Sequence, residues 1–447
     1  MERDKLSDLE AWLKDPLRKP LMIFGPRQCG KSYLAEDLFA KRFFPGEYIY
    51  LDLKKDSAAN SFLSSTVDPE KILTYLSARF NKDISKDTLL IFDEVQECLP
   101  IVTALKYFKQ DHPEIPVIET GSMVRIKIKR KKRGPGEKNF FYPVGSVHEM
   151  MLSPLGFGEF LSAKSPKMKE AIKEAYQKKT PLSSGLHEEA MDLLYEFLLV
   201  GGMPAVLQAY FSSSSLIKAR EEQNDIYNDY LADMDLYQVS SESLLRTREM
   251  FSSAYRQLSK ENENFSFKEM KTGNRSRDFS MPLDWLRLAG VCLPCFTLKE
   301  KISLPLREED ASTYRIYLLD NGLLAKQSQI NMGNFIDPNS RNDFEGVFFE
   351  NYIATEFTKV GVPLFAWKGK ENHEFEFVVN KGGLAVPIDV KKGKGSLNSL
   401  EAFRNHNKRG LAVKISKNNY GYDEKSMLLT LPLYMVPCFA EELASLS

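Results

Sequence analysis

The segment Gly25–Ser32 reads Gly-Pro-Arg-Gln-Cys-Gly-Lys-Ser and has the spacing of a phosphate-binding loop. It follows the apolar run 21–24 and precedes a helical pattern that begins at Tyr33. The two glycines let the backbone curl so that successive N–H groups point at phosphate oxygens, at the N-terminus of a helix. We expect Lys31 to reach the β- and γ-phosphates and the Ser32 hydroxyl to bind Mg²⁺. The pattern predicts a nucleoside triphosphate site.

A second pattern adds hydrolysis to nucleotide binding. The apolar strand 89–92 ends in the acids Asp93 and Glu94. At the C-terminal edge of a strand, the first carboxylate can hold Mg²⁺, and the next can orient or deprotonate the attacking water. Phosphoryl transfer demands mostly placement and charge neutralisation. We therefore expect Lys31 and Glu94 to be catalytic.

A third strand, 115–119, leads to Thr120, Gly121 and Ser122, where small hydroxyl side chains can contact the γ-phosphate or the attacking water. Arg27 and Arg125 are candidate charge stabilisers, because guanidinium binds phosphate oxygens in a bidentate manner. Cys29 is expected to fill space within the loop. The predicted nucleotide-contacting residues are Gly25, Pro26, Arg27, Gln28, Cys29, Gly30, Lys31, Ser32, Tyr33 and Ser122.

Acidic residues form a further constellation near the C-terminus. The segments 374–378 and 384–391 flank the turn 380–383 and predict a hairpin. Glu376, Asp389 and Lys391 take the faces opposite the apolar side chains, and Glu350 lies on a predicted helix, 344–360, among apolar neighbours. Two carboxylates and a lysine can bind a divalent metal and activate water, whereas the alternative is a half-solvated hairpin with a salt bridge.

These motifs lie on an alternation of strands and helices. Strands are predicted near 20–24, 47–53, 88–92, 115–119 and 147–152, which indicates an α/β core with a parallel sheet. Helix-rich sequence follows from about 166 to 300, and a boundary is predicted near 330–340.

Composition favours an intracellular machine of two or three domains. The chain has 447 residues, of which 43% are hydrophobic, with 61 basic and 61 acidic side chains. A net charge near zero gives no global attraction to nucleic acid or to an anionic membrane. The sequence predicts neither a membrane span nor a signal peptide, and the five cysteines have no disulfide or zinc-ligand spacing. We expect a cytoplasmic protein.

Two local basic clusters leave nucleic-acid binding open. The stretch 125–133 is the most basic, and it is either a solvated hairpin projecting from the core or a contact to phosphate backbones. Lys268, Lys271, Arg275 and Arg277 precede the helical run 283–288, in a region that is typical of a winged-helix-like module. Such modules also serve as protein contacts.

The chain resembles a bacterial and archaeal family of AAA-type P-loop ATPases that carry a C-terminal restriction-endonuclease-like domain. The resemblance rests on motifs that recur in this order along nearly the whole chain: GPRQCGKS at 25–32, LIFDEVQ at 90–96, ETGSM at 119–123, LSPLGFGEFL at 152–161, LLVGGMPAVL at 198–207, RIYLLDNGLLA at 315–325, FEGVFFENYIATE at 344–356, FAWKGKENHEFEFVV at 365–379, VPIDVKKGK at 386–394 and LPLYMV at 431–436.

The resemblance implies three domains: an additional-strand ATPase core at 1–165, a helical and winged-helix-like region at 166–335, and a nuclease-like α/β domain at 336–447. It places the sensor strand between the P-loop and Walker B strands. It also implies Mg²⁺ ligation by Ser32 and Asp93, and a nuclease pattern of Glu350, Glu376, Asp389 and Lys391. Both hairpin acids are swapped relative to that pattern, which moves each carboxylate by about one methylene. We therefore expect the fold without nuclease activity.

The expected function is Mg²⁺-dependent ATP binding and hydrolysis, coupled to DNA or to a protein partner. The alternative is a nucleotide-dependent switch or scaffold whose C-terminal domain is a non-catalytic binding module. The AAA-type resemblance also raises the expectation of a homo-oligomer.

Overall fold

In the computed structural model, the described residues are 1–122, 124, 126, 141–237, 240–260, 264–273, 275–307, 313–330, 333, 344–370, 373–391 and 398–446. They form two compact units, Met1–Ser153 and Pro154–Ser447. Each unit is described by itself below.

The first unit is built on a parallel sheet of five strands in the order β2-β3-β4-β1-β5. The order places β4 between β1 and β3, so the predicted position of the sensor strand between the P-loop and Walker B strands is confirmed. The strands are β1 (Leu21–Phe24), β2 (Tyr48–Asp52), β3 (Leu89–Asp93), β4 (Val117–Gly121) and β5 (His148–Met151).

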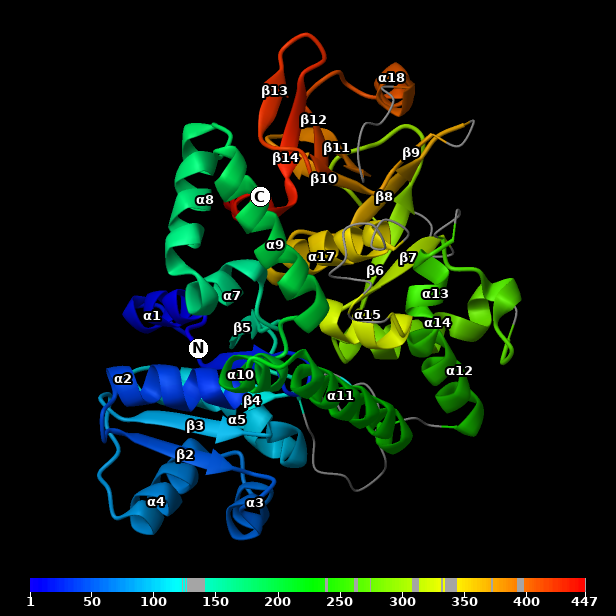
Figure 1. Ribbon diagram of the computed structural model, residues 1–447. Helices are drawn as coiled ribbons and strands as arrows, with labels where there is room; N and C mark the ends of the chain where they lie inside the picture. The colour runs from blue at the N-terminus through cyan, green and yellow to red at the C-terminus, as the bar shows by residue number, and fades with distance from the viewer. Residues whose placement is uncertain are drawn as a thin grey trace. The chain divides into compact units, whose positions relative to one another are not determined.

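Helices cover both faces of this sheet (Figure 1). One core joins alternate strand residues to α3, α4 and α5, and the other joins the intervening residues to α1 and η1. This alternation follows from the period of two along a strand. The elements are α1 (Leu6–Lys14), the π-type helix η1 (Tyr33–Ala40), α2 (Lys41–Phe43), α3 (Ser57–Leu63), α4 (Pro69–Phe80), η2 (Val95–Glu97) and α5 (Leu99–Asp111).

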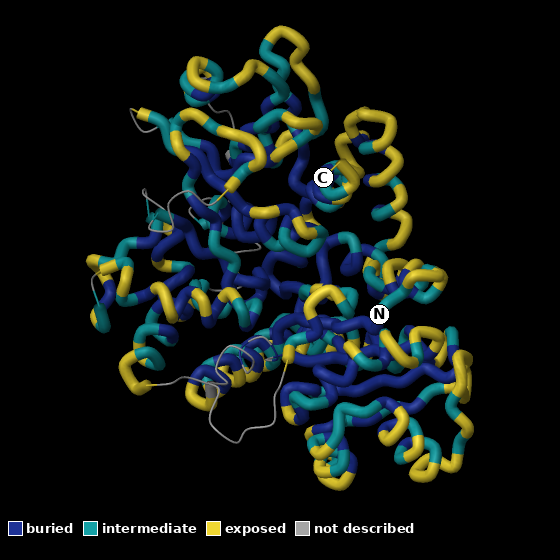
Figure 2. Tube along the Cα trace, turned by 180° about the vertical axis from the view of Figure 1, so that it is seen from behind, coloured by how far each residue is buried: buried dark blue, intermediate teal, exposed yellow. Residues whose placement is uncertain are grey.

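Burial along the strands explains their sequences. All five residues of β3 are buried because neighbouring strands and both helical layers enclose it, whereas the edge strand β2 alternates between buried and partly exposed residues. Figure 2 shows the buried strands of this unit as a dark blue layer between helices with exposed outer faces. The strands therefore form the buried centre of the unit.

The second unit contains two sheets. One has four strands in the order β7-β6-β8-β9, and the other has five in the order β10-β11-β12-β14-β13. The strands are β6 (Cys292–Leu298), β7 (Tyr314–Leu318), β8 (Phe365–Lys368), β9 (Glu374–Phe375), β10 (Phe377–Lys381), β11 (Leu384–Lys391), β12 (Ala412–Ser416), β13 (Gly421–Asp423) and β14 (Leu428–Pro432). Because β6 pairs with β8, the first sheet joins strands on both sides of residues 330–340.

The predicted C-terminal hairpin is present but shorter than expected. β10 and β11 pair antiparallel around Gly382 and Gly383, both of which have positive φ. Residues 374–375 form the separate strand β9, which pairs with β8 in the other sheet. Glu376 therefore lies at the break between two sheets, and the prediction of one continuous strand over 374–378 was wrong.

Helices surround these two sheets. They are α7 (Phe157–Lys164), α8 (Pro166–Lys178), α9 (Ser184–Val200), α10 (Pro204–Ser213), α11 (Leu216–Tyr237), α12 (Ser241–Ser252), α13 (Ala254–Leu258), η3 (Phe267–Glu269), α14 (Ser276–Leu288), α15 (Asn321–Ser328), α17 (Glu345–Lys359), α18 (Asn398–His406), η5 (Leu433–Met435) and α19 (Val436–Ser445). Within the described residues, no single helix is long and apolar enough to span a membrane; α9 and α10, bent by 120°, pass that test only as a pair.

Candidate functional site

The loop Gly25–Gly30 connects β1 to η1 and is held close to the backbone that follows β5. A Cβ atom on Gly25 would lie 2.2 Å from the carbonyl oxygen of Leu152, so this position has room only for glycine. Gly30 has φ +91°, which also favours glycine. The backbone therefore requires or favours glycine at both positions, and the predicted role of the loop in phosphate binding stays a prediction.

Lys31 reaches back over this loop. Its Nζ donates to the carbonyl oxygens of Pro26 at 2.7 Å and Gly25 at 3.2 Å, and the residue is 7% exposed. These bonds hold the ammonium group at the loop that the sequence assigned to phosphate. The positive charge and the loop thus lie together, as phosphate binding requires.

Arg3, which is buried, anchors the loop through backbone carbonyl groups. Its guanidinium donates from Nη1 to the Cys29 carbonyl at 2.7 Å and from Nη2 to the Ser153 carbonyl at 2.6 Å. The Cys29 thiol is fully buried and donates to the Leu152 carbonyl at 3.4 Å. A planar guanidinium suits such a bridge because its donors form a rigid fork. The loop is therefore pinned to the segment that follows β5.

Asp93, at the end of β3, is the centre of the polar network. Its Oδ2 accepts from the Ser32 hydroxyl at 2.6 Å and from the Tyr50 hydroxyl at 2.5 Å. Its Oδ1 accepts from the Glu94 backbone N–H at 2.9 Å and from the Thr120 hydroxyl. Burial, followed by the bond to Asp93, raises the pKa of Tyr50, so its phenol stays protonated. Four donors from four places in the chain thus fix this carboxylate.

Glu94 has an unusual backbone conformation. Its φ is +55° and its ψ +41°, in the left-handed region that side chains other than glycine, asparagine and aspartate rarely adopt. The Gln96 side-chain amide donates to Glu94 Oε2, which fixes the direction of this carboxylate. Strain of this kind persists only where surrounding contacts hold it, and it is common at functional sites.

The two hydroxyl residues near the end of β4, Thr120 and Ser122, differ in their hydrogen-bond partners. The Thr120 hydroxyl is engaged by Asp93. Ser122 is 7% exposed, and its hydroxyl has no hydrogen-bond partner among the described residues. That free hydroxyl agrees with the sensor role predicted for Ser122, which stays a prediction.

Glu119, also on β4, is a buried acid that the sequence analysis did not single out. It is fully buried, and neither carboxyl oxygen has a hydrogen-bond partner within the part of the chain that the structure describes. Burial raises the pKa of Glu119 well above its ordinary value, because a charge without a partner is unfavourable in an apolar core. It is opposite Met22 and Phe92 in the sheet.

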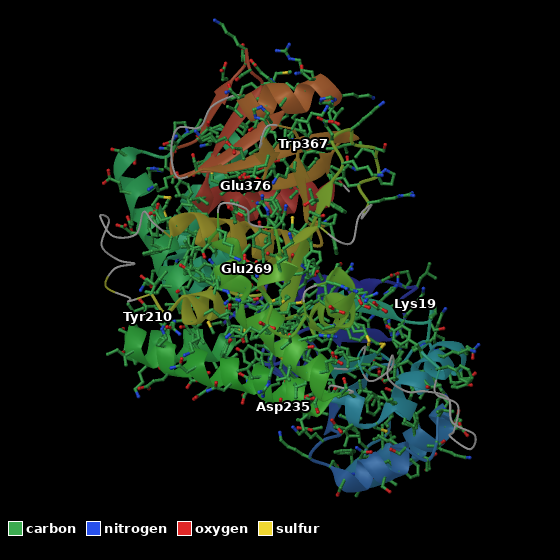
Figure 3. The ribbon with its side chains drawn as sticks, turned by 90° about the vertical axis from the view of Figure 1, so that its right-hand side faces the viewer. Lys19, Tyr210, Asp235, Glu269, Trp367 and Glu376 are labelled. Carbon is green, nitrogen blue, oxygen red and sulfur yellow. The ribbon has the colours of Figure 1, made fainter. Side chains whose placement is uncertain are left out.

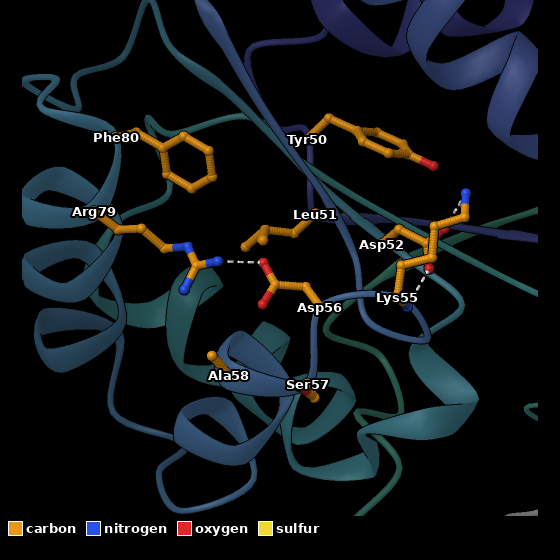
Figure 4. A pocket seen from close by; sticks show the side chains of 9 residues that line it. All are labelled: Tyr50, Leu51, Asp52, Lys55, Asp56, Ser57, Ala58, Arg79 and Phe80. Carbon is orange, nitrogen blue, oxygen red and sulfur yellow. Dashed lines mark hydrogen bonds and ion pairs between the residues drawn. The ribbon is translucent and has the colours of Figure 1, made fainter.

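A pocket of about 500 Å³ opens at the C-terminal end of β2 (Figure 4). Two ion pairs line it: Lys55 with Asp52 at 2.8 Å and Arg79 with Asp56 at 2.6 Å. Tyr50 belongs both to this pocket and to the Asp93 network. The pocket therefore adjoins Asp93, the predicted metal-binding acid.

The structure brings together Lys31, Ser32, Asp93 and Glu94 through the contacts above. Arg27 is partly buried, and Tyr33 is 41% exposed at the start of η1. Arg125 and the rest of the basic stretch, apart from Ile126, lie outside the described residues. The sequence analysis missed Arg3 and Tyr50, because each acts across a tertiary contact that its neighbours in sequence do not signal. It also missed Gln96, whose contact with Glu94 is local, two residues away along the chain.

The C-terminal acids are engaged with other protein groups. Glu350 accepts from the Tyr317 hydroxyl at 2.9 Å and from Arg315 Nη1 at 3.4 Å, and all three residues are buried. Glu376, labelled in Figure 3, accepts the Val390 backbone N–H at 2.8 Å. Both acids are thus buried and bonded within the protein, unlike the half-solvated hairpin of the alternative interpretation, and the metal site stays a prediction.

The remaining predicted members of this group, Asp389 and Lys391, both belong to β11. Asp389 is partly exposed on β11, opposite Lys414 of β12. Lys391 ends β11, and its side chain lies outside the description. Among the described residues, no group of three or more histidine, cysteine, aspartate or glutamate side chains is placed to hold a metal ion.

Family models match three stretches of the chain, and the first of these covers most of the first unit. Residues 17–161 match the family model of an AAA domain. Residues 191–333 and 345–434 match two domains of unknown function, DUF8612 and DUF4143. The chain thus carries an AAA-type P-loop domain, on a parallel sheet of the expected kind, and the restriction-endonuclease-like assignment of the C-terminal part stays a prediction.

Solved structures give weaker likenesses. The Walker-type ATPase PABY2304 of Pyrococcus abyssi is 15% identical, with a TM-score of 0.43 over 74% of this chain and 96% of that one. The C. elegans protein PCH-2 is 13% identical, with a TM-score of 0.21 over 41% of this chain and 50% of that one. No curated protein matches the chain.

Proposed function

We propose that the first unit binds ATP with Mg²⁺ and hydrolyses it. The observation that carries this proposal is the contact between the Ser32 hydroxyl and the Asp93 carboxylate, 2.6 Å apart, beside the loop that holds Lys31. Hydroxyl and carboxylate oxygens are the hard ligands that Mg²⁺ prefers. The two groups therefore fit the metal that a P-loop domain uses, and Mg²⁺, when bound, neutralises charge on the β- and γ-phosphates.

Each residue then has a role that follows from its position. Loop N–H groups and Lys31 bind the phosphates, with Lys31 exchanging its carbonyl contacts for phosphate oxygens. Asp93, fixed by Tyr50 and Thr120, keeps its orientation when Ser32 turns to the metal. Glu94 accepts a proton from the attacking water, or orients that water, from the direction set by Gln96.

The test is ATP turnover by the full chain together with the variant Glu94→Gln. We expect the variant to bind ATP as the parent does while hydrolysis falls by about 100-fold or more, since it removes the group that activates water. Glu97→Gln is the matched control, because it makes the same change three residues further on. Lys31→Ala is expected to lose nucleotide affinity. A parent chain with no affinity for ATP in magnesium buffer would refute the proposal.

We propose that ATP hydrolysis is coupled to a macromolecular partner, and that the C-terminal domain binds this partner without cleaving it. The contacts of Glu350 with Arg315 and Tyr317 favour this version, because an acid that is already neutralised by a buried guanidinium is a poor metal ligand. The measurement is Mg²⁺- or Mn²⁺-dependent cutting of DNA. Cutting by the parent chain that disappears in Asp389→Ala would overturn the non-catalytic assignment.

A further inference from the structure

Residues 241–318 of the second unit contain a compact series of elements, which we call the α14 module. The helices α12 and α13 are followed by Phe265, whose N–H donates to the Tyr314 carbonyl at 2.8 Å and so adds an extended residue beside β7. The turn η3, the helix α14 and the antiparallel strands β6 and β7 complete it. The order of these elements is that of a winged helix-turn-helix. Helices come first, then one extended residue, the turn η3, the helix α14 and a two-stranded ribbon.

Helix α14 has one buried and one exposed face. The buried face packs through Phe279, Leu283 and Leu286, and Phe279 contacts the rings of Phe265 and Phe267 at centroid distances of 6.1 and 5.8 Å. The exposed residues are spaced three or four apart and form one stripe along the helix. They are Arg277, Ser280, Met281, Asp284 and Arg287. The stripe is therefore held outward by a well-packed core.

The residues on and next to this stripe are predominantly basic. Residues 264–307 include eight basic and four acidic side chains, whereas the whole α14 module, 241–318, has thirteen basic and eleven acidic ones. Several of these acids are bound to neighbouring groups: Glu269, labelled in Figure 3, pairs with Lys260, Glu300 lies against His406, and Asp278 accepts the Arg275 N–H. The exposed basic residues are Lys268, Lys271, Arg275, Arg277, Arg287, Lys299, Lys301 and Arg307.

The basic residues lie on both sides of α14 in the sequence. Lys268, Lys271 and Arg275 precede the helix, and Lys299, Lys301 and Arg307 follow β6, in the connection that leads toward β7. A helix of 13 residues is about 20 Å long and fits the major groove of B-form DNA. Flanking cations suit the phosphates on either side of that groove.

We propose that the α14 module binds duplex DNA, with the exposed stripe of α14 in the major groove and the flanking basic residues on the phosphate backbone. Arg277 and Ser280 carry donors for base edges, and Met281, 64% exposed, offers an apolar surface to a thymine methyl group. The narrow major groove of duplex RNA excludes such a helix. The proposal goes beyond ATP hydrolysis, since no residue of the nucleotide site takes part.

Fluorescence anisotropy of the full chain with a labelled 30-base-pair DNA duplex, without nucleotide, tests the proposal. With about five phosphate contacts, affinity should fall roughly 500-fold between 50 and 200 mM salt. The double variant Arg275→Glu, Arg277→Glu should bind at least about tenfold more weakly and lower the salt slope by about two. Lys178→Glu with Lys218→Glu is the matched control, because both lysines are exposed in the same unit.

Several outcomes would overturn the proposal. They are no binding at 50 mM salt, equal loss of binding in the control variant, and equal binding of duplex RNA. Binding of an acidic protein, and not of DNA, to the α14 module would also overturn it. The Arg275 and Arg277 variant is expected to keep the parent rate of ATP turnover, which shows that it is folded. A chain that binds DNA but not ATP would refute only the proposed function.

Discussion

Asp320 gives the sharpest test of how the second unit is held together. It lies just before α15 at 3% exposure; its Oδ2 accepts the Gly202 N–H at 2.5 Å, and its Oδ1 accepts the Leu323 N–H at 3.0 Å. Burial raises its pKa from 3.8 to about 6, although these backbone donors oppose the shift. The folded chain therefore binds this proton more tightly than the unfolded chain does.

The sign and size of the effect follow from linkage. Because the folded-state pKa is raised, the proton stabilises the fold below pH 3.8, and that contribution is lost as pH rises through about 6. A shift of about two units corresponds to about 3 kcal/mol. Of this, about 2 kcal/mol is lost between pH 4.5 and 7.5, because the unfolded group is already mostly ionised at pH 4.5.

The substitution that tests this is Asp320→Asn, which removes the titrating carboxyl group and keeps nearly the same side-chain shape. Asparagine leaves one of the N–H donors without an acceptor, which costs about 1–3 kcal/mol at every pH. The difference in unfolding free energy between parent and variant should nevertheless move by about 2 kcal/mol in favour of the variant between pH 4.5 and 7.5. Urea denaturation followed by tryptophan fluorescence measures it, because Trp285 and Trp367 both lie in this unit.

A difference between parent and variant that does not change with pH would refute the reasoning. It would mean that Asp320 titrates near its ordinary pKa in spite of its burial. A change of the opposite sign would mean that the backbone donors outweigh the desolvation of the carboxylate. Comparing two chains at each pH cancels every other titrating group that they share.

Three further predictions concern the first unit. Tyr50→Phe removes a charge-assisted bond to Asp93 worth about 1.5–3 kcal/mol, so the Mg²⁺ concentration for half-maximal ATP turnover should rise; an unchanged Mg²⁺ dependence contradicts this role. Glu119→Gln should raise the unfolding free energy at pH 8, with a gain that shrinks toward pH 5, because the raised pKa makes ionisation unfavourable; denaturation at both pH values decides. Arg3→Ala should raise the KM for ATP and lower the Tm. Arg3→Lys should restore neither, since a lysine ammonium cannot bridge the Cys29 and Ser153 carbonyls as the rigid guanidinium fork does.

The sequence determined the parts of the site whose geometry is local. Gly25 to Gly30 form one loop that continues directly into a helix at Lys31, and Asp93 ends a strand that Glu94 directly follows, so their spacing along the chain already fixes their spacing in space. The five strands of the first unit were predicted to within about two residues for the same reason, because the apolar runs are bounded by polar turns. Their parallel arrangement follows from the alternation with helices.

Only the tertiary structure decided which distant residues complete the site. Tyr50, Thr120 and Arg3 reach Asp93 or the loop from other strands or from the N-terminal segment, and a hydrogen bond between residues 43 positions apart leaves no local pattern. The C-terminal acids make the same point, since only the structure shows that the Glu350 carboxylate contacts the Arg315 guanidinium. Propensity and periodicity act over a few residues, whereas burial and ion pairing depend on how the chain closes on itself.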